Sequence, residues 1–287
     1  MTSWQSTPES EAGSAPALGE VIAAFEARYP PSLAESWDAV GWVCGDPQTR
    51  VTRVLFAVDP TEEVAAEAAG LGAEVIITHH PLFLTPVHGV AALTPGGRLV
   101  HGLIEQGRAL YVAHTNADRA HSGVSDALAE ILGVVDTVAL VRDDNDPTVG
   151  LGRIGRLADP VTLAEFAERV ATALPATAQG VRAAGDPQVM IEKVAVCGGS
   201  GESLAGAAER AGADVFVTAD AKHHRTLDHR AAGGCAIIDV AHWASEWPWL
   251  NIAAAHLRED LGNTVETVVS THVTDPWSLH VPARPRS

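Results

Sequence analysis

Residues 54–78 read VLFAVDPTEEVAAEAAGLGAEVIIT, and residues 194–218 read VAVCGGSGESLAGAAERAGADVFVT. The two stretches align without a gap at a constant offset of 140 residues. In each stretch a short apolar run precedes an Ala-rich run that ends at a glycine, Gly72 or Gly212, and a second apolar run follows. This order is typical of a strand, a helix and a parallel strand. We therefore expect a parallel sheet around each copy.

A second match joins residues 98–114 to residues 226–242 at an offset of 128. Both read as a helix that leads into a strand, and they end at His114 and His242. Four residues further on, Asp118 coincides with Glu246. The sequence thus predicts an α/β fold of two similar domains, each a central sheet flanked by helices, that arose by internal duplication.

The predicted organisation has five parts. The stretch VRDDNDPTVG carries the Asp, Asn, Pro and Gly content of a turn or linker and separates the copies. We expect a disordered tail over residues 1–17, a first domain over 18–141, a linker over 142–150, a second domain over 151–282 and a tail over 283–287.

Composition restricts the class of protein. The 287 residues carry a formal net charge of −17, which opposes a general role in binding the phosphate backbone of nucleic acids. The three cysteines form no C-x-x-C pair, which argues against a disulfide framework and fits a reducing compartment. The N-terminus lacks signal-peptide features, and no apolar run could span a bilayer. We expect a cytoplasmic protein without a membrane partner.

Two adjacent histidines, His79 and His80, follow the apolar run VIIT and precede Pro81. They would lie at the carboxyl end of a parallel strand, where α/β sheets gather their ligand sites. Neutral imidazoles bind borderline metals, and adjacent histidines at a bend can face two ions. The alternative is a pair of hydrogen-bonded residues at a sheet edge.

Two further pairs have the spacing H-x-x-x-acid: His114 with Asp118, and His242 with Glu246. Residues i and i+4 share one helix face, so each pair could hold one ion, although such pairs are often only surface ion pairs. Together these motifs predict a two-metal site with the ligands His79, His80, Asp118, His242 and Glu246. Without a thiolate, this set suits Zn, Mn, Fe, Co or Ni, with zinc slightly preferred.

The second copy offers two candidate contacts for an anion. Gly198, Gly199, Ser200 and Gly201 form a loop between a predicted strand and helix, where N–H groups could bind phosphate. A tight turn capped by a serine explains the same residues. Lys222 and His224 could neutralise an anionic substrate or transfer protons, or they could begin a solvated helix.

Six motifs occur in the order of a known family: ESWDAVGWVCGDP, THHPLF, AHTNAD, AVCGGSG, TADAKHH and DVAHWASE. With them the chain resembles the Nif-three-like dinuclear-metal proteins, the GTP cyclohydrolase I type 2 homologues. The resemblance implies the same five metal ligands, with His114 as an auxiliary residue beside them. It also implies a toroidal homohexamer whose metal sites face an internal cavity.

The chain departs from the family pattern at four positions outside the predicted ligands. Ala39 and Trp42 replace the family's Asn and Leu, and Ala219 and His223 replace its Gly and Tyr. Ala219 and His223 lie in the second half of the chain, so the resemblance predicts the metal ligands more strongly than it predicts the substrate pocket. The short stretch 142–150 also indicates that a domain inserted in some relatives is absent here.

These features lead to one functional hypothesis and two alternatives. The hypothesis is a hydrolase that acts on a nucleotide through metal-activated water, with His114, Lys222 and His224 as candidate catalytic groups. If the resemblance extends to activity, C8 of the guanine of GTP is attacked. One alternative is a phosphohydrolase or amidohydrolase of another small metabolite. The other is a non-catalytic metal-binding hexamer that serves as a scaffold or regulator.

Overall fold

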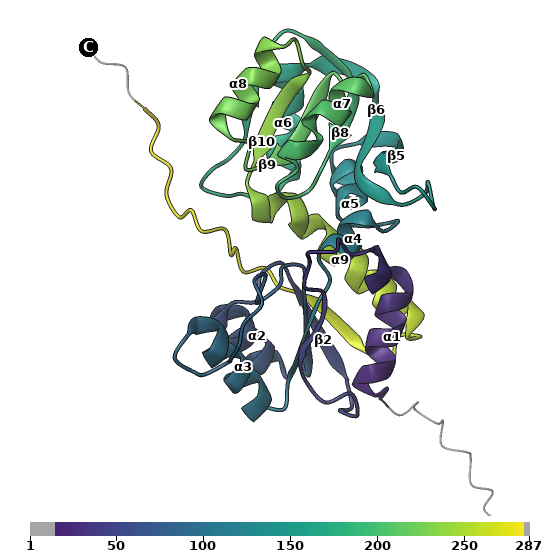
Figure 1. Ribbon diagram of the computed structural model, residues 1–287, viewed down its shortest axis with the longest axis vertical. Helices are drawn as coiled ribbons and strands as arrows, with labels where there is room; N and C mark the ends of the chain where they lie inside the picture. The colour runs from purple at the N-terminus through teal and green to yellow at the C-terminus, as the bar shows by residue number, and fades with distance from the viewer. Residues whose placement is uncertain (1–14, 284–287) are drawn as a thin grey trace, which may run out of the picture.

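Two β-sheets, each flanked by helices, make up the computed structural model, which describes residues 15–283 (Figure 1). The sheets lie one above the other along the long axis of the molecule. Both are mixed, with a parallel centre and antiparallel strands at one or both sides. The predicted α/β class, with two sheets flanked by helices, is confirmed.

The first sheet has the strand order β1-β4-β3-β2-β11. Its strands are β1 (Gly41–Cys44), β2 (Arg53–Ala57), β3 (Val75–Thr78), β4 (Ala109–Val112) and β11 (Glu266–Val269). All neighbours are parallel except β1 and β4. The three central strands are almost wholly buried, as expected for parallel strands covered on both faces.

The second sheet has the order β5-β6-β8-β9-β10-β7. Its strands are β5 (Val134–Arg142), β6 (Gly150–Thr162), β7 (Arg182–Ala184), β8 (Met190–Val196), β9 (Val215–Ala219) and β10 (Ala236–Val240). The neighbours β8, β9 and β10 are parallel, and the other pairs are antiparallel. The long strand β5 forms one edge.

Helices cover both faces of the sheets. They are α1 (Leu18–Arg28), α2 (Glu62–Leu71), α3 (Pro95–Glu105), α4 (Thr115–Arg119), α5 (Val124–Ile131), α6 (Leu163–Ala173), α7 (Ala205–Arg210), α8 (His223–Ala231) and α9 (His242–Asp260), with short 3₁₀ turns η1 (Pro31–Leu33) and η2 (Glu202–Leu204). In β2, Phe56 belongs to the core shared with α1 and α9, whereas Leu55 packs with α2 and α3 on the opposite face. None of the helices between residues 15 and 283 has the length and apolar content needed to cross a membrane.

The first predicted repeat has a direct counterpart in strand register. Val54 pairs with Val75 in the first sheet, and Val194 pairs with Val215 in the second, which preserves the offset of 140. The next parallel strand of each sheet, β4 or β10, has an offset of 127 residues between the copies in place of the predicted 128. Thr78 pairs with Val112, whereas Thr218 pairs with Asp239. His114 is consequently the N-cap of α4, while His242 is the first residue of α9.

The sheets do not divide the chain at the predicted linker. Within residues 142–150, Arg142 ends β5, Gly150 begins β6, and residues 143–149 form the turn between these antiparallel neighbours of the second sheet. The last strand, β11, returns to the first sheet beside β2. The chain can return to the first sheet because α9 carries it from β10 back across the waist of the molecule (Figure 1).

The predicted tails are only partly described. Residues 1–14 and 284–287 lie outside the described residues. In the predicted tail 1–17, the carbonyl of Pro16 accepts a hydrogen bond from the Val51 N–H at 3.0 Å, and Ala17 forms a bridge with Arg50. Residues 16 and 17 of the predicted tail are therefore hydrogen-bonded to the loop before β2.

Candidate metal centre

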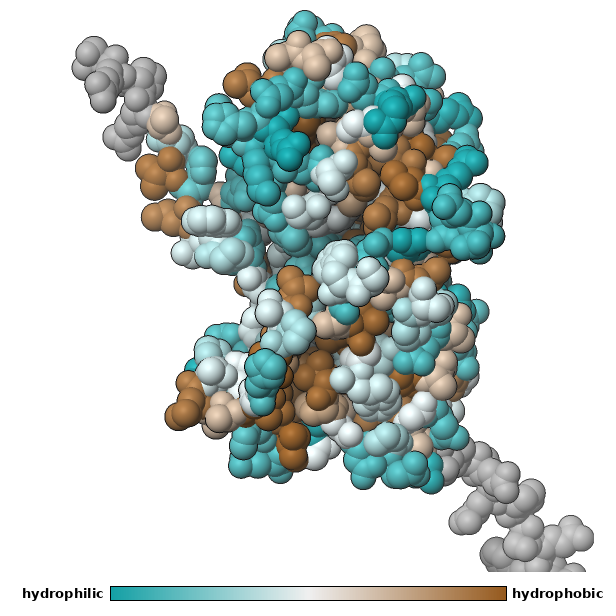
Figure 2. Space-filling model, in the orientation of Figure 1, coloured by the Kyte–Doolittle hydropathy of each residue, from teal (hydrophilic) through white to brown (hydrophobic). Residues whose placement is uncertain are grey.

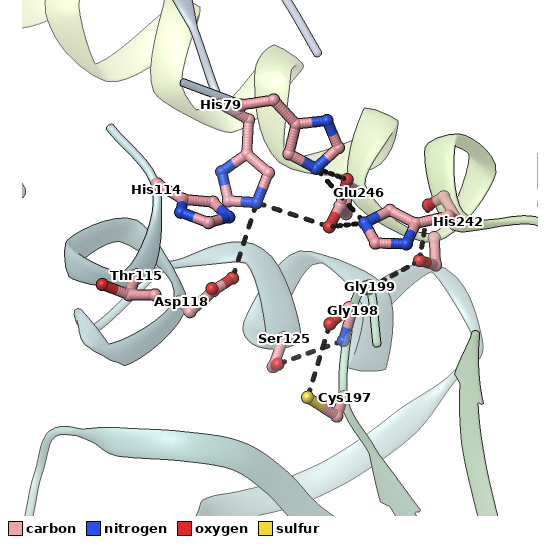
Figure 3. Close-up of polar contacts among 12 residues, drawn as sticks. His79, His114, Thr115, Asp118, Ser125, Cys197, Gly198, Gly199, His242 and Glu246 are labelled. Atoms are coloured by element: carbon pink, nitrogen blue, oxygen red, sulfur yellow. Dashed lines mark hydrogen bonds and ion pairs between the residues drawn. The ribbon is translucent and has the colours of Figure 1, made fainter. Parts of the chain in front are cut away.

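The carboxyl ends of the parallel strands of both sheets meet at the waist of the molecule. His79 and His80 directly follow β3, and His242 follows β10 by two residues. The loop after β8 reaches the same place (Figure 3). Because ligand sites of α/β sheets lie at these strand ends, one site here draws residues from both sheets.

Two imidazoles and one carboxylate form the centre of the cluster. The Nε2 atoms of His80 and His242 lie 3.2 Å apart. Glu246 Oε2 lies 3.0 Å from Nε2 of His80, and Glu246 Oε1 lies 3.0 Å from Nε2 of His242. The predicted i,i+4 pair on α9 thus has both side chains on one face.

His79 brings a second carboxylate into the cluster. Its Nε2 lies 3.4 Å from Glu246 Oε1 and 3.7 Å from Asp118 Oδ1 (Figure 3). The imidazole of His79 and the carboxylate of Glu246 are almost completely buried, at 1% and 3% exposure. All five predicted ligands are therefore brought together.

His114 lies closer to this centre than the sequence indicated. The ligand atoms of His79, His80 and His114 lie within 4.8 Å of one another, as do those of His80, His242 and Glu246. Each trio could hold a metal ion. His80 belongs to both trios, so the two groups form one continuous cluster.

The other ring nitrogen of each histidine faces an oxygen acceptor. Nδ1 of His79 lies 2.9 Å from the carbonyl of Ala113. The Nδ1 atoms of the other three histidines face carboxylates: His80 faces Asp59 at 2.7 Å, His114 faces Asp38 at 2.8 Å and His242 faces Asp220 at 2.6 Å. These acceptors place the proton on Nδ1 of a neutral ring and leave the Nε2 lone pair for a metal, an arrangement typical of metal-binding histidines.

The cluster lacks a positive partner when its histidines are neutral. The Nε2 atoms of His80 and His242 would then face each other as two acceptors beside a carboxylate. Oε2 of Glu246 is buried without a hydrogen-bond donor, since the approach of His80 at 3.0 Å lacks hydrogen-bond geometry. Bound cations would satisfy all of these atoms, so the residues fit a metal centre.

The shifted pKa values of the metal-free cluster also indicate that it requires positive charge. The charge of Glu246 raises the pKa of His242 to about 11 against the opposing effect of burial, with support from Asp220. For His80, burial lowers the pKa, but Glu246 and Asp59 outweigh it and raise the pKa to about 10. Burial would raise the pKa of Glu246, yet the three histidines hold it well below its usual range. Protons thus occupy the place of cations in the metal-free protein.

Asp118 has a different environment from Glu246. Burial raises its pKa above the usual value, and His79 opposes this shift only in part. Its carboxylate extends toward His79 from α4. A cation beside it would favour the charged form and so make Asp118 available as a ligand.

The glycine-rich loop forms a wall of the cluster. Gly199 has a φ of +63°, and a Cβ atom there would lie 2.3 Å from Oε1 of Glu246. The N–H groups of Gly199 and Gly201 donate to the hydroxyls of Ser245 and Thr218, at 2.9 and 2.8 Å. The N–H of Gly198 lies 3.4 Å from the Ser125 hydroxyl. These three N–H groups already have partners within the protein, so the loop does not fit the predicted phosphate site. Of its four N–H groups, only that of Ser200 has no such partner and could bind an anion.

The predicted groups Lys222 and His224 lie at the start of α8, outside the histidine cluster. Both are exposed, and the ammonium of Lys222 lies 3.9 Å from Glu202. α8 itself has no buried residue. They match the alternative interpretation, a solvated helix start, and the structure does not bring these two candidate catalytic groups to the histidine cluster.

The three carboxylates that contact the Nδ1 atoms of the histidines were not predicted from the sequence. Asp59 follows β2, Asp220 follows β9 and Asp38 precedes β1, and none of them was among the predicted site residues. Asp38 also accepts a hydrogen bond from the Thr115 N–H at 2.9 Å. For Asp59 and Asp220 the available signal was an acidic residue just after an apolar strand, at the sheet edge where ligand sites gather.

Comparisons with known proteins identify the relatives of this chain. The model of the family Duf34/NIF3 (NGG1p interacting factor 3) matches residues 16–276. A Streptomyces coelicolor protein named GTP cyclohydrolase 1 type 2 homolog is 52% identical, covering 95% of this chain and 97% of its own. A Mycobacterium tuberculosis protein of the same name is 36% identical, covering 91% of this chain and 97% of its own.

Solved structures show the same fold. A Bacillus cereus protein related to NIF3 superposes with a TM-score of 0.86 at 28% identity, covering 93% of this chain and 100% of the other. Reduced HcgD from Methanocaldococcus jannaschii has a TM-score of 0.73 at 26% identity, covering 89% of this chain and 98% of the other. From its motifs, its fold and these relatives, the chain belongs to the Duf34/NIF3 family.

Proposed function

We propose that this chain is a hydrolase that binds two divalent metal ions through His79, His80, Asp118, His242 and Glu246. One observation carries the proposal: imidazoles from both sheets converge on Glu246, each with its Nδ1 facing an acceptor. Such outer partners fix the ring and its tautomer for metal binding. The buried, unpaired Oε2 of Glu246 supports it further.

The ligand chemistry favours a borderline metal. Imidazole and carboxylate together suit Zn, Mn, Fe, Co or Ni, and zinc is the first to test. Cys197 lies nearby, but burial raises the pKa of its thiol to about 12. Its Sγ lies 3.4 Å from the Gly198 carbonyl, and Cys197 belongs to neither trio that could hold a metal ion, so it is not proposed as a ligand.

Two divalent ions supply a nucleophile from water near neutral pH and electrostatic stabilisation of the transition state. Glu246 would contribute a ligand oxygen to each ion, because its Oε1 lies near His79 and His242 while its Oε2 lies near His80. His114 is the proposed proton-transfer group. Asp38 holds its Nδ1, which orients the ring toward the cluster.

A nucleotide is the proposed substrate, and GTP is the first to test because close relatives carry the name GTP cyclohydrolase 1 type 2 homolog. The proposed reaction is hydrolytic attack at C8 of guanine. Lys222, with a side chain 78% exposed, is the proposed contact for a phosphate tail. Inertness toward GTP and other nucleotides in the metal-loaded protein would favour a scaffold or regulatory role.

A homohexamer is the proposed assembly. Edge strand β5 supports it, because Val135, Val138 and Val141 are 43, 46 and 39% exposed. An uncovered edge with apolar side chains invites pairing with another chain. The metal sites would then face a shared internal space.

Metal analysis of purified protein tests the proposed centre. We expect two ions per chain in the wild type, and at most one after His79→Ala or Glu246→Ala, because both side chains lie at the centre of the cluster. GTP turnover should fall with the metal content. Elemental analysis by mass spectrometry and a cyclohydrolase assay give the two readouts.

The chain offers a matched control for these substitutions. His101 and Glu105 form another H-x-x-x-E pair, exposed on α3. His101→Ala and Glu105→Ala should keep both metal ions and full turnover. Two metal ions retained in Glu246→Ala would refute the ligand assignment.

A further inference from the structure

The segment after β11 contacts the rest of the molecule at a defined point. From residue 271 to residue 283, only Thr274 and Asp275 are half-buried, and the other residues are exposed. The chain then projects away from the two sheets without helix or strand (Figures 1 and 2). Thr274 therefore marks a specific contact within an otherwise exposed stretch.

This contact leads directly into the metal centre. The Thr274 hydroxyl donates a short hydrogen bond to Oδ2 of Asp59. The other oxygen of Asp59, Oδ1, lies 2.7 Å from Nδ1 of His80. Nε2 of His80 in turn lies 3.2 Å from Nε2 of His242. A hydroxyl near the C-terminus is thus two hydrogen bonds away from a proposed metal ligand.

The segment starts from a fixed position beside the same site. The Ser270 N–H donates to the Phe56 carbonyl at 2.8 Å, and the Ser270 carbonyl accepts from Nε1 of Trp247 at 2.9 Å. Its hydroxyl donates to Glu67 at 2.6 Å. Trp247 follows Glu246 on α9, so Ser270 links the last strand to the helix that carries two proposed ligands.

Asp59 needs a second partner to hold its orientation. The torsion that rotates a carboxylate has broad minima, so a single hydrogen bond to His80 defines its plane poorly. The side chain is also 27% exposed, which lets water compete for its oxygens. The Thr274 hydroxyl occupies one oxygen and so turns the other toward His80.

We propose that Thr274 is a positioning residue of the metal centre: through Asp59 it fixes the ring orientation and tautomer of His80, and the C-terminal segment thereby completes the site. This inference rests on the proposed metal centre. It assigns a function to a residue outside both sheets and all six sequence motifs.

Metal titration of chelator-treated full-length protein tests the inference. Co²⁺ is the probe, because its visible absorption reports ligand geometry, and a competing chelator gives the affinity. We expect Thr274→Val to weaken binding of one of the two ions about tenfold, near the low end of the loss of roughly 10–100-fold typical of outer-shell partners. Thr274→Ser keeps the hydroxyl and should restore both the affinity and the spectrum.

Thr271→Val is the matched control, the same substitution three residues earlier at an exposed position. It should bind both ions like the wild type. Wild-type affinity and spectrum in Thr274→Val, or an equal loss in Thr271→Val, would overturn the inference while leaving the metal centre intact. A wild type without stoichiometric metal would overturn both. Metal binding without GTP turnover would remove only the hydrolase, and the positioning role would stand.

Discussion

Gly199 stands at a position that the site keeps free of a side chain. Its φ of +63° is a left-handed conformation that costs other residues about 1 kcal/mol or more. A Cβ would also lie 3.1 Å from Nε2 of His242 and still closer to Glu246. Backbone conformation and the space needed by the ligands therefore demand glycine independently.

We expect Gly199→Ala to lose metal binding as well as stability, because its methyl group would displace Glu246. Gly212→Ala separates the two effects. Gly212 has a φ of +74°, but its Cβ would meet only the Lys193 ammonium at 3.8 Å. Both variants should unfold at lower temperature, whereas only Gly199→Ala should lose metal in the Co²⁺ titration. Equal metal affinities would contradict the role of Gly199 in shaping the site.

The titration of His80 and His242 gives the metal-free protein a characteristic pH dependence. Their pKa values are raised in the folded state, to about 10 and about 11, from about 6.5 in the unfolded chain. Their stabilisation is thus complete below pH 6.5 and is lost as the pH rises toward 10. Chelator-treated protein should melt at a lower temperature at pH 9 than at pH 6.5.

Metal binding should respond to pH in the opposite direction. Ions displace protons from the histidines, so the affinity for Zn²⁺ should increase between pH 6.5 and pH 9. Calorimetry in buffers of different ionisation enthalpy measures the protons released. His242→Ala should flatten the pH dependence of melting, and His101→Ala should leave it unchanged. A steep dependence that survives in His242→Ala would assign it to other groups.

An ion pair with a buried arginine and a partly buried aspartate joins strand β6 to helix α5. Arg153 is 3% exposed and donates to both oxygens of Asp126, at 2.6 and 2.8 Å. It also donates to the carbonyls of Gly150, Gly152 and Ala120. This guanidinium joins the second sheet to the helices that lead away from the metal centre.

Replacement of Arg153 by Met should cost about 3–5 kcal/mol of unfolding free energy, because it leaves Asp126 and three carbonyls without their partner. Arg156→Met is the control on the same strand. Its pair with Asp136 is exposed, with side-chain exposures of 59 and 64%, and should contribute about 0–1 kcal/mol. Urea unfolding of both variants measures the difference. Similar costs would show that burial does not set the strength of the Arg153 pair.

Helices and strands could be predicted from the sequence where they depend on residues that are close together in the chain. The βαβ units follow from apolar runs and helix stops, and both copies have the predicted register. The pairing of β11 with β2 could not be predicted, because pairing between strands that are far apart in the sequence leaves no periodic signal. The same holds for the partners of the ligands, since Asp38 lies 76 residues before His114.

The whole molecule is organised around the meeting of two sheets at their carboxyl ends. α9 spans the waist and carries His242 and Glu246, while α4 carries Asp118 from the first sheet toward it (Figure 1). Because the site draws ligands from both sheets, its geometry depends on how they are held together. Buried Trp249 of α9 contributes to this by packing against the rings of Tyr29 and His79.

Light scattering coupled to gel filtration tests the proposed assembly. We expect a particle of six times the chain mass of 29.9 kDa. Val138→Lys places a charge on exposed edge strand β5 and should reduce the particle mass, since like charges would meet where copies pair. Leu93→Lys is the control, as Leu93 is 89% exposed in the loop before α3. A monomeric wild type would refute the hexamer.

The return of β11 also fixes the order of events during synthesis. Strands β1 to β4 leave the ribosome early, but β2 has no partner on its outer side until residues 266–269 have been made. His79 and His80 are translated more than 160 residues before His242. Cotranslational folding can therefore build most of the first sheet, whereas the two proposed ions can be bound only after Glu246 has been made.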